Sequence, residues 1–485
     1  MEKDGTRSRE RSRLPEAIPA VAAMLIGLWG ITTPSFWRDE SVSALAAAMP
    51  LDDLWHLLGS IDRVHALHYL LLRPFAAVST GELAMRLPSA VATAAAAYGV
   101  VVLGRRLAGP GAGLLAGSLY AVLPIVSRYA QEARSYAIVT AVAVLATWLL
   151  VEATRRSGRR RYAAYGACLV LLGWFHVYAL LLVVAHAVTV LVYRYRPPSP
   201  SPSPSPSPSP SPSPGVARFA GALALAAAGI APLALLAAGQ REAQLSWLKP
   251  STLADVVWFG EEVAGTGWVA LLLAALVVLG TLSGGPLAAV ALPWALLPFV
   301  SMAISVVHPV FHPRYVLFAV PAMALLAGAG LNAVRPRAAG WIGLVLVAAL
   351  TVPAHLTIRE PDGRPDDLRT MAATLLARQR PGDAVLYMAE KRRLFVAVYG
   401  DAYRGLRDLT FPPGRREPRT AAQLTAALEG VERVWLVSGG RKFKDRVLVG
   451  DERRYLALMD NRDFTLESTE DFGYSWFSLY VRERR

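Results

Sequence analysis

Long apolar segments separated by short polar loops occupy the chain from residue 14 to residue 358. About 20 consecutive apolar residues are enough for a helix to cross the hydrocarbon of a bilayer. We count about eleven such segments, several of them short, which predicts a mainly α-helical, polytopic membrane protein. The predicted spans are Leu14–Thr33, Leu83–Leu103, Ala112–Val126, Ala137–Ala153, Tyr162–Phe175, Val177–Tyr193, Val216–Ala238, Trp268–Leu282, Leu287–Val307, Val316–Leu331 and Trp341–Ile358.

Two stretches outside the predicted spans show other patterns. Ser41–Glu82 is only moderately apolar, with leucines at helical spacing beside charged residues, which is typical of helices in the plane of the membrane interface. From Arg359 onward, amphipathic helices alternate with short apolar strands, which predicts a small α/β domain. We expect helices at Asp367–Arg378, Thr420–Leu428 and Glu452–Met459, strands at Ala384–Met388, Val431–Ser438, Phe464–Ser468 and Tyr474–Val481, and a turn at Gly439-Gly440.

Composition agrees with a membrane protein. Of the 485 residues, 54% are hydrophobic and 18% are charged, and the mean hydropathy is +0.37. The net charge of +14 does not indicate nucleic-acid binding, because no long Lys/Arg run lies beside stacking aromatic residues. The single cysteine, Cys168, lies in an apolar segment and excludes an intrachain disulfide framework and a cluster of thiolate zinc ligands.

The arginines predict the orientation of the chain. Clusters at Arg105/Arg106, Arg155–Arg161, Arg194/Arg196/Arg218 and Arg335/Arg337 fall on the same side as the arginines before the first span, which we expect to be a retained anchor. The positive-inside rule assigns this side to the cytoplasm. We therefore expect an integral protein of the plasma membrane, and the heavy use of Ala, Arg and Pro suggests a bacterial source. The expected parts are a cytoplasmic N-terminal tail (1–13), a transmembrane module with the first outer loop (14–196), a cytoplasmic Ser-Pro linker (197–215), a second transmembrane module (216–358) and an extracytoplasmic α/β domain (359–485).

Three short polar segments lie on the opposite side. The first polar segment is Arg38–Glu40, the second is Arg128–Tyr136, and the third is His308–Tyr315. Ionisable residues at a membrane border are unfavourable unless they face a cavity and pair. Any one segment could be ordinary loop charge, but three on one side indicate a functional site.

The residue types in these segments suit transfer from a phosphate-linked donor to a hydroxyl group. Arginine binds phosphate oxygens in a bidentate manner. Arg134 and Arg314 would therefore neutralise a phosphodiester and stabilise the charge that develops on its leaving oxygen. A carboxylate of the adjacent Asp39 and Glu40 would accept the proton of the acceptor hydroxyl. We expect the other carboxylate, Glu40, to pair with Arg134. A lipid-linked donor would explain a site at the membrane surface.

Four motifs in a fixed order carry a family resemblance. They are Trp37-Arg38-Asp39-Glu40, Arg86-Leu87-Pro88-Ser89, Gln131-Glu132-Ala133-Arg134-Ser135-Tyr136 and His312-Pro313-Arg314-Tyr315. They resemble the motifs of polytopic glycosyltransferases with the GT-C fold, and most of all glycosyltransferase family 39. That group includes the protein O-mannosyltransferases and the lipid A aminoarabinose transferases. The resemblance covers the chain from residue 14 to residue 358 and implies a sugar on a polyprenyl phosphate as the donor.

The resemblance also implies roles for individual residues. The proposed base of the family's first loop corresponds to Asp39, its neighbour to Glu40, and the arginine of the second loop to Arg134. Relatives carry a His-Pro-Pro-Leu-Tyr-type element where this chain has Val64–Tyr69 without prolines, so the histidines there could bind substrate or only cap an interface helix. We expect donor-phosphate contacts from Arg134, Arg314, Tyr136 and Arg128, and substrate contacts from His65, His68, Tyr315 and Glu132.

The sequence thus predicts an inverting glycosyltransferase that moves a sugar from a polyprenyl-phosphate donor to an extracytoplasmic hydroxyl acceptor. By analogy the sugar is mannose or a related hexose, and the acceptor is a protein, lipid or glycan. A divalent metal stays open, because acidic and histidine residues border the site but no ligand spacing demands one. The alternatives are a transporter or lipid flippase for cell-envelope glycoconjugates, although no internal repeat is visible, and a non-catalytic membrane anchor.

Overall fold

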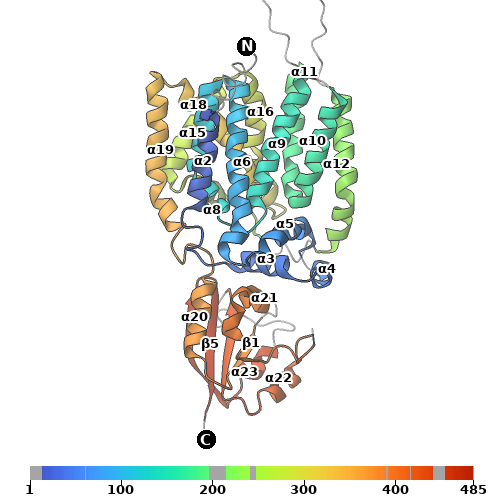
Figure 1. Ribbon diagram of the computed structural model, residues 1–485, viewed down its shortest axis with the longest axis vertical. Coiled ribbons are helices and arrows are strands. Elements are labelled where there is room, and N and C mark those ends of the chain that lie inside the picture. Colours follow the sequence, from blue (N-terminus) through green and yellow to red (C-terminus); the bar gives the residue numbers. More distant parts are fainter. Residues whose placement is uncertain are drawn as a thin grey trace, which may run out of the picture. The chain divides into compact units, whose positions relative to one another are not determined.

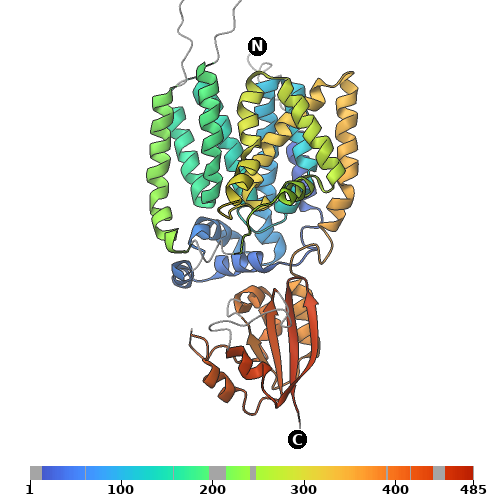
Figure 2. The same ribbon diagram turned by 180° about the vertical axis from the view of Figure 1, so that it is seen from behind.

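The computed structural model describes residues 14–60, 62–156, 158–195, 215–240, 247–388, 392–415, 417–440 and 454–483. These residues form two compact units (Figures 1 and 2). The membrane unit comprises the described residues up to Trp29, Pro50–Leu72 and Arg86–Thr357. The C-terminal unit comprises Gly30–Met49, Arg73–Met85 and Ile358–Arg485. The expected N-terminal tail and the Ser-Pro linker, apart from Gly215, lie outside the described residues.

Most of the membrane unit consists of helices that run side by side (Figure 1). Two of them are shared between the units, because the end of α5 and the start of α6 belong to the C-terminal unit. The helices are α2 (Leu14–Leu28), α4 (Leu51–Ser60), α5 (Ala66–Ala76), α6 (Glu82–Ala108), α7 (Pro110–Val122), α8 (Pro124–Ala130), α9 (Tyr136–Arg155), α10 (Arg159–Phe175), α11 (Leu182–Tyr195), α12 (Val216–Ala237), α14 (Leu253–Ala264), α15 (Gly267–Leu282), α16 (Gly285–Ala295), α17 (Leu297–Ser305), α18 (Val320–Ala333) and α19 (Arg337–Thr357), with the 3-10 segments η1 (Arg63–His65), η2 (Val177–Leu181), η3 (Ala238–Gln240) and η4 (Pro313–Ala319).

Every predicted span contains a helix. Within the described part of the chain, seven helices are long and apolar enough to cross a membrane. The number rises to nine if the bent pairs α7–α8 (63°) and α14–α15 (90°) are each one span. Two further helices are shorter, α2 with 15 residues and α10 with 17 residues. A mainly helical, polytopic membrane fold is thus confirmed, whereas the count of about eleven spans is not.

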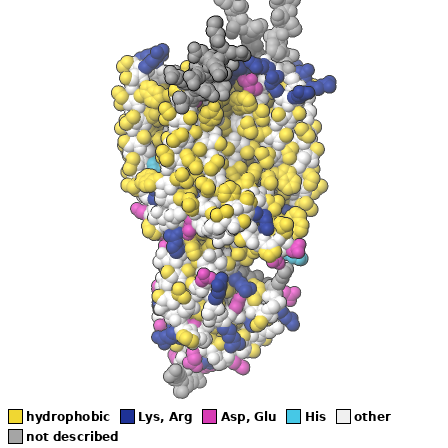
Figure 3. Space-filling model, viewed as in Figure 1, with side chains coloured by type: hydrophobic (Ala, Val, Ile, Leu, Met, Phe, Trp, Pro, Cys, Tyr) yellow, Lys and Arg dark blue, Asp and Glu magenta, His cyan; other side chains and the backbone are white. Residues whose placement is uncertain are grey.

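The surface of the membrane unit is divided between apolar and basic regions. Leu25, Ile342 and Val345 are each more than 60% exposed, and hydrophobic side chains cover most of the face drawn in Figure 3. Lys and Arg side chains gather at one end of the bundle, where α6 ends with Arg105 and Arg106. At this end α2 begins, α11 ends and α12 begins (Figure 1), and Arg105 forms an ion pair with Glu16 of α2. Such a surface suits a helical bundle in lipid.

Small residues allow the central helices to approach closely. The helix α18 is almost completely buried. A Cβ atom added at Gly280 of α15 would collide with the carbonyl oxygen of Leu326 on α18, and one added at Gly328 of α18 would collide with Ala116 of α7. Close backbone approach at glycine and alanine is the usual way in which membrane helices pack.

The C-terminal unit contains a five-stranded sheet in the order β2-β1-β3-β5-β4. The strands β1, β2 and β3 are parallel, whereas β5 runs antiparallel to β3 and β4 antiparallel to β5. Helices cover both faces of the sheet, as expected for the central strands β1 and β3, which are buried along their whole length. The elements are α3 (Arg38–Ala48), α20 (Leu368–Arg378), β1 (Ala384–Tyr387), α21 (Arg392–Val396), η5 (Ala397–Tyr403), β2 (Arg407–Asp408), α22 (Ala421–Ala427), β3 (Arg433–Gly439), α23 (Leu456–Met459), β4 (Phe464–Phe472) and β5 (Ser475–Arg482).

Alternate residues of β1, β3 and β5 enter two separate apolar cores. Val385 and Tyr387 of β1 pack with α20 and η5 on one face. Ala384 and Leu386 pack with α22 and α23 on the other face. The predicted α/β character is therefore confirmed, and the predicted strands and the helices at 367–378 and 420–428 match observed elements. Of the expected helix 452–459, residues 452 and 453 lie outside the described residues and α23 covers only Leu456–Met459. The expected turn coincides with the end of β3 at Gly439 and with Gly440, whose φ is +86°. The elements α21, η5 and β2 were not predicted from the sequence, because they are short and lack a clear apolar period.

Candidate functional site

Arg134 and His65 form the centre of a polar cluster inside the membrane unit. Arg134 lies in the loop between α8 and α9 and is only 6% exposed. Its Nη2 atom lies 2.7 Å from Nε2 of His65 in η1. Because a guanidinium group can only donate, Nη2 is the donor and His65 accepts through an unprotonated Nε2. The contact joins the second polar segment to the 64–69 stretch.

Both histidines of this stretch are held neutral. Burial, and to a smaller extent the positive charge of Arg134, lower the pKa of His65 well below its usual value. The same two causes lower the pKa of His68 to about 3. The Nε2 atom of His68 lies 3.2 Å from the carbonyl oxygen of Ala133, so that it carries the proton and donates. His68 thereby fixes the backbone directly before Arg134.

Three rings bring the second and third polar segments together. The rings of Tyr136 and Tyr315 lie 6.4 Å apart. His176, at the junction of α10 and η2, lies 5.8 Å from Tyr136 and 5.5 Å from Tyr315. Such tilted contacts between rings are favourable and stiff. The start of α9 and the start of η4 are thus held side by side.

Arg314 lies at the same place, in η4, among aromatic rings. Its guanidinium carbon is 5.2 Å from the ring centre of Trp247 and 5.4 Å from that of Tyr315. Its backbone N–H points to Nδ1 of His312 at 3.4 Å, so that the histidine caps the segment. Stacking against aromatic faces suits arginine, whose charge is delocalised and weakly hydrated.

The second polar segment is fixed by its own neighbours. Glu132 is 1% exposed, and its Oε2 atom lies 3.8 Å from Nε of Arg128, one turn earlier. The Ser89 hydroxyl of α6 donates to the carbonyl oxygen of Glu132 at 2.7 Å. The Gln131 side chain donates to the carbonyl oxygen of Gly27 in α2 at 3.0 Å. The loop that carries Arg134 is therefore rigidly held between α2 and α6.

Asp39 and Glu40 lie in the other unit, in the first turn of α3. Asp39 is half-buried, whereas Glu40 is fully buried. The Arg38 side chain beside them stacks on Tyr474, with its guanidinium carbon 3.9 Å from the ring centre. A carboxylate in the first turn of a helix is stabilised by the positive end of the helix dipole. Because Arg134 belongs to the membrane unit, the expected pair between Glu40 and Arg134 stays a prediction.

Metal binding is not supported by the described side chains. Among the described residues, no group of three or more His, Cys, Asp and Glu side chains is arranged to hold a metal ion. His65 uses Nε2 to accept from Arg134, and His68 uses Nε2 to donate to a carbonyl group. These two Nε2 atoms are therefore occupied by contacts within the protein, whereas Nδ1 of each ring is buried without a hydrogen bond.

The structure brings most of the predicted residues together within the membrane unit. His65 contacts the Arg134 side chain, and His68 contacts the backbone of Ala133 directly before it. The rings of Tyr136 and Tyr315 lie against each other. Asp39 and Glu40 lie in the C-terminal unit. Sequence reasoning missed the contributions of His176, Trp247 and Tyr69. The Tyr69 hydroxyl donates to Asp62 at 3.0 Å. Trp247 lies between the predicted spans 216–238 and 268–282, but no motif connects it to Arg314.

Comparison with known sequences gives one match. Residues 65–199 match the family model of dolichyl-phosphate-mannose-protein mannosyltransferases. This range begins at His65 and contains the second polar segment. Among curated proteins, no sequence matches the chain significantly.

Solved structures share the fold over nearly the whole chain. The apo structure of ArnT from Cupriavidus metallidurans is 14% identical, with a TM-score of 0.62 over 95% of this chain and 97% of that chain. The same protein bound to undecaprenyl phosphate is 13% identical, with a TM-score of 0.60 over the same shares, 95% and 97%. The archaeal oligosaccharyltransferase AglB from Archaeoglobus fulgidus, in complex with an inhibitory peptide and a dolichol-phosphate, is 10% identical, with a TM-score of 0.52 over 87% of this chain and 69% of that chain.

Proposed function

The chain has the GT-C fold of membrane glycosyltransferases, as the motif resemblance predicted, and we propose that it transfers a sugar from a polyprenyl-phosphate donor to a hydroxyl group. The donor lipid class is supported by relatives of this fold whose structures contain undecaprenyl phosphate or dolichol-phosphate. The sugar is proposed to be mannose or a related hexose, by analogy with the matching family.

The observation that carries the proposal is the cluster around Arg134. Two arginines of this unit each contact neutral or aromatic side chains: Arg134 contacts His65, and Arg314 contacts Trp247 and Tyr315. Their positive charges also act together, because both depress the basicity of His65. Fixed positive charge in a largely buried place is what a phosphodiester, and the phosphate leaving from it, require.

The reaction balances without a cofactor. The acceptor oxygen attacks the anomeric carbon, and a new glycosidic bond forms as the bond from that carbon to the phosphate oxygen breaks. The polyprenyl phosphate leaves with the bonding electron pair, and Arg134 and Arg314 stabilise the added negative charge. Asp39 takes the proton of the acceptor hydroxyl as general base. Attack from the face opposite the leaving group inverts the anomeric configuration.

Further residues of the polar segments act around these groups. In the proposal, Arg128 and Tyr136 complete the phosphate site, while Glu132 holds Arg128 in place. His65 and His68 hold Arg134 and its backbone as neutral partners. Tyr315 lines the same cluster beside His176. We propose that the site faces the outside of a bacterial plasma membrane. The positive-inside rule supports this orientation, because Lys and Arg gather at the end of the bundle where α11 ends and α12 begins, and that end would be cytoplasmic.

Release of the carrier lipid tests the proposal. The purified full-length chain is incubated with undecaprenyl-phosphate-linked hexoses and pentoses and with candidate acceptors, and free undecaprenyl phosphate is measured. We expect release with at least one hexose donor, and loss of release in Arg134→Gln but not in Arg378→Gln, an arginine in the last turn of α20. Movement of the labelled lipid across a vesicle membrane without any release would contradict the proposal and favour a flippase.

A further inference from the structure

The segment that carries Asp39 is built into the C-terminal unit. This unit contains residues 30–49 with α3, residues 73–85 with the start of α6, and the α/β domain from Ile358 onward. The chain enters it at Gly30, where φ is +64° and a Cβ atom would press against the Arg359 side chain. The α/β domain is thus the direct neighbour of the segment from Thr32 to Glu40.

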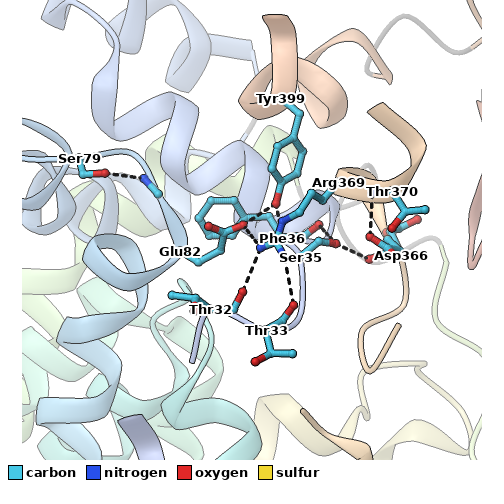
Figure 4. A network of polar contacts seen from close by, with 12 residues as sticks. Thr32, Thr33, Ser35, Phe36, Ser79, Glu82, Asp366, Arg369, Thr370 and Tyr399 are labelled. Carbon is cyan, nitrogen blue, oxygen red and sulfur yellow. Dashed lines mark hydrogen bonds and ion pairs between the residues drawn. The ribbon is translucent and has the colours of Figure 1, made fainter. Parts of the chain in front are cut away.

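Glu82, in the first turn of α6, binds two side chains of the α/β domain (Figure 4). Its Oε1 atom accepts from the hydroxyl group of Tyr399 at 2.6 Å and from Nη2 of Arg369 at 2.5 Å. Burial, and next the hydrogen bond to Glu82, raise the pKa of Tyr399, so that its hydroxyl keeps the proton that it donates. Hydrogen bonds to an ionised group are about twice as strong as neutral ones.

The same two side chains also hold the backbone before Asp39. The guanidinium group of Arg369 donates to the carbonyl oxygens of Thr32 at 3.0 Å and Thr33 at 3.1 Å. The Tyr399 oxygen accepts from the backbone N–H of Phe36 at 3.0 Å. Figure 4 shows these contacts converging on one stretch of chain from two helical segments of the α/β domain. The stretch is therefore fixed three residues ahead of Asp39.

A fourth contact reaches the helix itself. The N-cap residue of α3 is Trp37, whose side chain has no acceptor and cannot cap the first turn. The carboxylate of Asp366 takes this place: its Oδ2 atom lies 3.4 Å from the backbone nitrogen of Arg38, and its Oδ1 atom accepts from the Ser475 hydroxyl at 2.6 Å. A carboxylate at this position satisfies a free N–H group and complements the helix dipole.

We propose that the α/β domain is the positioning element of the catalytic carboxylate, with Arg369, Tyr399 and Asp366 as positioning residues that set the place and direction of Asp39. The proposal rests on the proposed function, in which Asp39 is the base. A general base must lie within hydrogen-bond reach of the proton that it takes. A displacement of about 1 Å by a change far from the chemistry can lower a rate about 100-fold. In this proposal the domain acts on the chemical step through the position of Asp39.

The test compares Tyr399→Phe and Arg369→Gln with Arg378→Gln in the full-length chain. Tyr399→Phe keeps the ring but removes the bonds to Glu82 and Phe36. Arg378 is the matched control, since it ends the same helix α20 and its partners Glu470 and Ser468 lie on β4. Hydrogen exchange of peptides covering residues 32–44, the affinity for undecaprenyl phosphate, and kcat are measured for each variant.

We expect faster exchange over residues 32–44 in both test variants, because their backbone contacts are lost. We also expect kcat to fall about tenfold or more, with unchanged affinity for undecaprenyl phosphate and no change in the control. Arg369→Lys keeps the charge beside Glu82 and should recover part of kcat. Asp366→Asn, which keeps the shape and the Ser475 contact, provides a second route should Arg369→Gln fail to fold.

The positioning role would be overturned by unchanged exchange in Tyr399→Phe, or by faster exchange with unchanged kcat. A matched loss of kcat in Arg378→Gln would overturn it as well, since it would show only a general effect of the domain. Failure of the proposed function looks different, because Asp39→Asn would then be fully active. In that case the exchange result alone decides whether the domain holds this segment.

Discussion

The guanidinium group of Arg134 donates a hydrogen bond to Nε2 of His65, so a neutral imidazole orients a buried arginine. Because this partner carries no negative charge, it fixes the direction of the guanidinium group while leaving its charge intact. His65 stays neutral since burial and the arginine itself lower its pKa. The arrangement suits an arginine that must meet a phosphate group of a ligand.

The first prediction concerns this pair. His65→Ala should raise the KM for the lipid-linked donor about tenfold. A hydrogen bond to a charged group contributes about 1.5–3 kcal/mol, and we expect only part of this free energy to be lost from donor binding. His65→Gln supplies another neutral acceptor and should recover most of the affinity. Steady-state kinetics at saturating acceptor measure both. Equal KM values in His65→Ala and the unchanged protein would show that the contact does not orient Arg134 for the donor.

The second prediction concerns pH and stability. The pKa of His68 is lowered to about 3 in the folded protein, whereas an unfolded histidine has a pKa of about 6.5. Between these values the unfolded chain binds more protons than the folded one, so stability is complete above pH 6.5 and falls as the pH falls toward 3. At pH 5 the loss should be about 2 kcal/mol from this group.

Thermal unfolding in detergent at pH 7.5 and pH 5 measures this loss. His68→Gln keeps a donor for the Ala133 carbonyl group and cannot titrate. Its drop in Tm between the two pH values should be clearly smaller than that of the unchanged protein. An equal drop in both proteins would contradict a neutral, buried His68.

The third prediction concerns Ser89, whose hydroxyl donates to the carbonyl oxygen of Glu132. Ser89→Ala removes the hydrogen bond to the buried carbonyl oxygen of Glu132 and should lower the free energy of unfolding by about 1–2 kcal/mol. Turnover should fall as well, because the loop that carries Arg134 is released from α6. Ser283→Ala removes an exposed hydroxyl that also bonds a carbonyl group and serves as the control. Turnover in Ser89→Ala equal to that of Ser283→Ala would show that this contact does not matter for the site.

The fourth prediction concerns orientation in the membrane. Cys168 is buried, so engineered cysteines can be labelled with little background. An impermeant thiol reagent added to intact cells should label a cysteine at Asp401, in the α/β domain, but not one at Ser205, in the Ser-Pro tract. Labelling of Ser205→Cys from outside would reverse the topology that the arginines predict.

Strong local patterns made most of the fold predictable. The spans were visible because apolar runs such as 216–238 and 341–358 need no tertiary context to be recognised. The helix α20 and the strand β3 were predicted almost to the residue. The number of spans was harder to predict, because the pairs α7–α8 and α14–α15 bend at Pro124 and Gly265. Apolar composition on both sides of a bend does not show that the helix changes direction there. Short elements such as β2 depend on pairing with β1 and have no pattern of their own.

The candidate site was predictable in its residue types but not in its contacts. Arg134, Arg314 and Tyr136 could be named as candidates because charged and aromatic residues between spans are recognisable in the sequence. The role of His65 as a neutral partner of Arg134 could not be found, since it depends on burial and on η1. The contacts of Arg369 and Tyr399 with residues 32–36 join segments that are far apart in the sequence. They could not be predicted, because local sequence patterns carry no information on such pairs.

The central claim is that Asp39 takes the proton of the acceptor hydroxyl in sugar transfer from a polyprenyl phosphate. The most direct measurement is the rate at which purified Asp39→Asn releases undecaprenyl phosphate from the lipid-linked sugar, together with its affinity for undecaprenyl phosphate. Loss of a general base should lower the rate by about 10²–10⁴ while the affinity stays close to that of the unchanged protein. A near-normal rate in Asp39→Asn would contradict the claim and point to Glu40 or another group as the base.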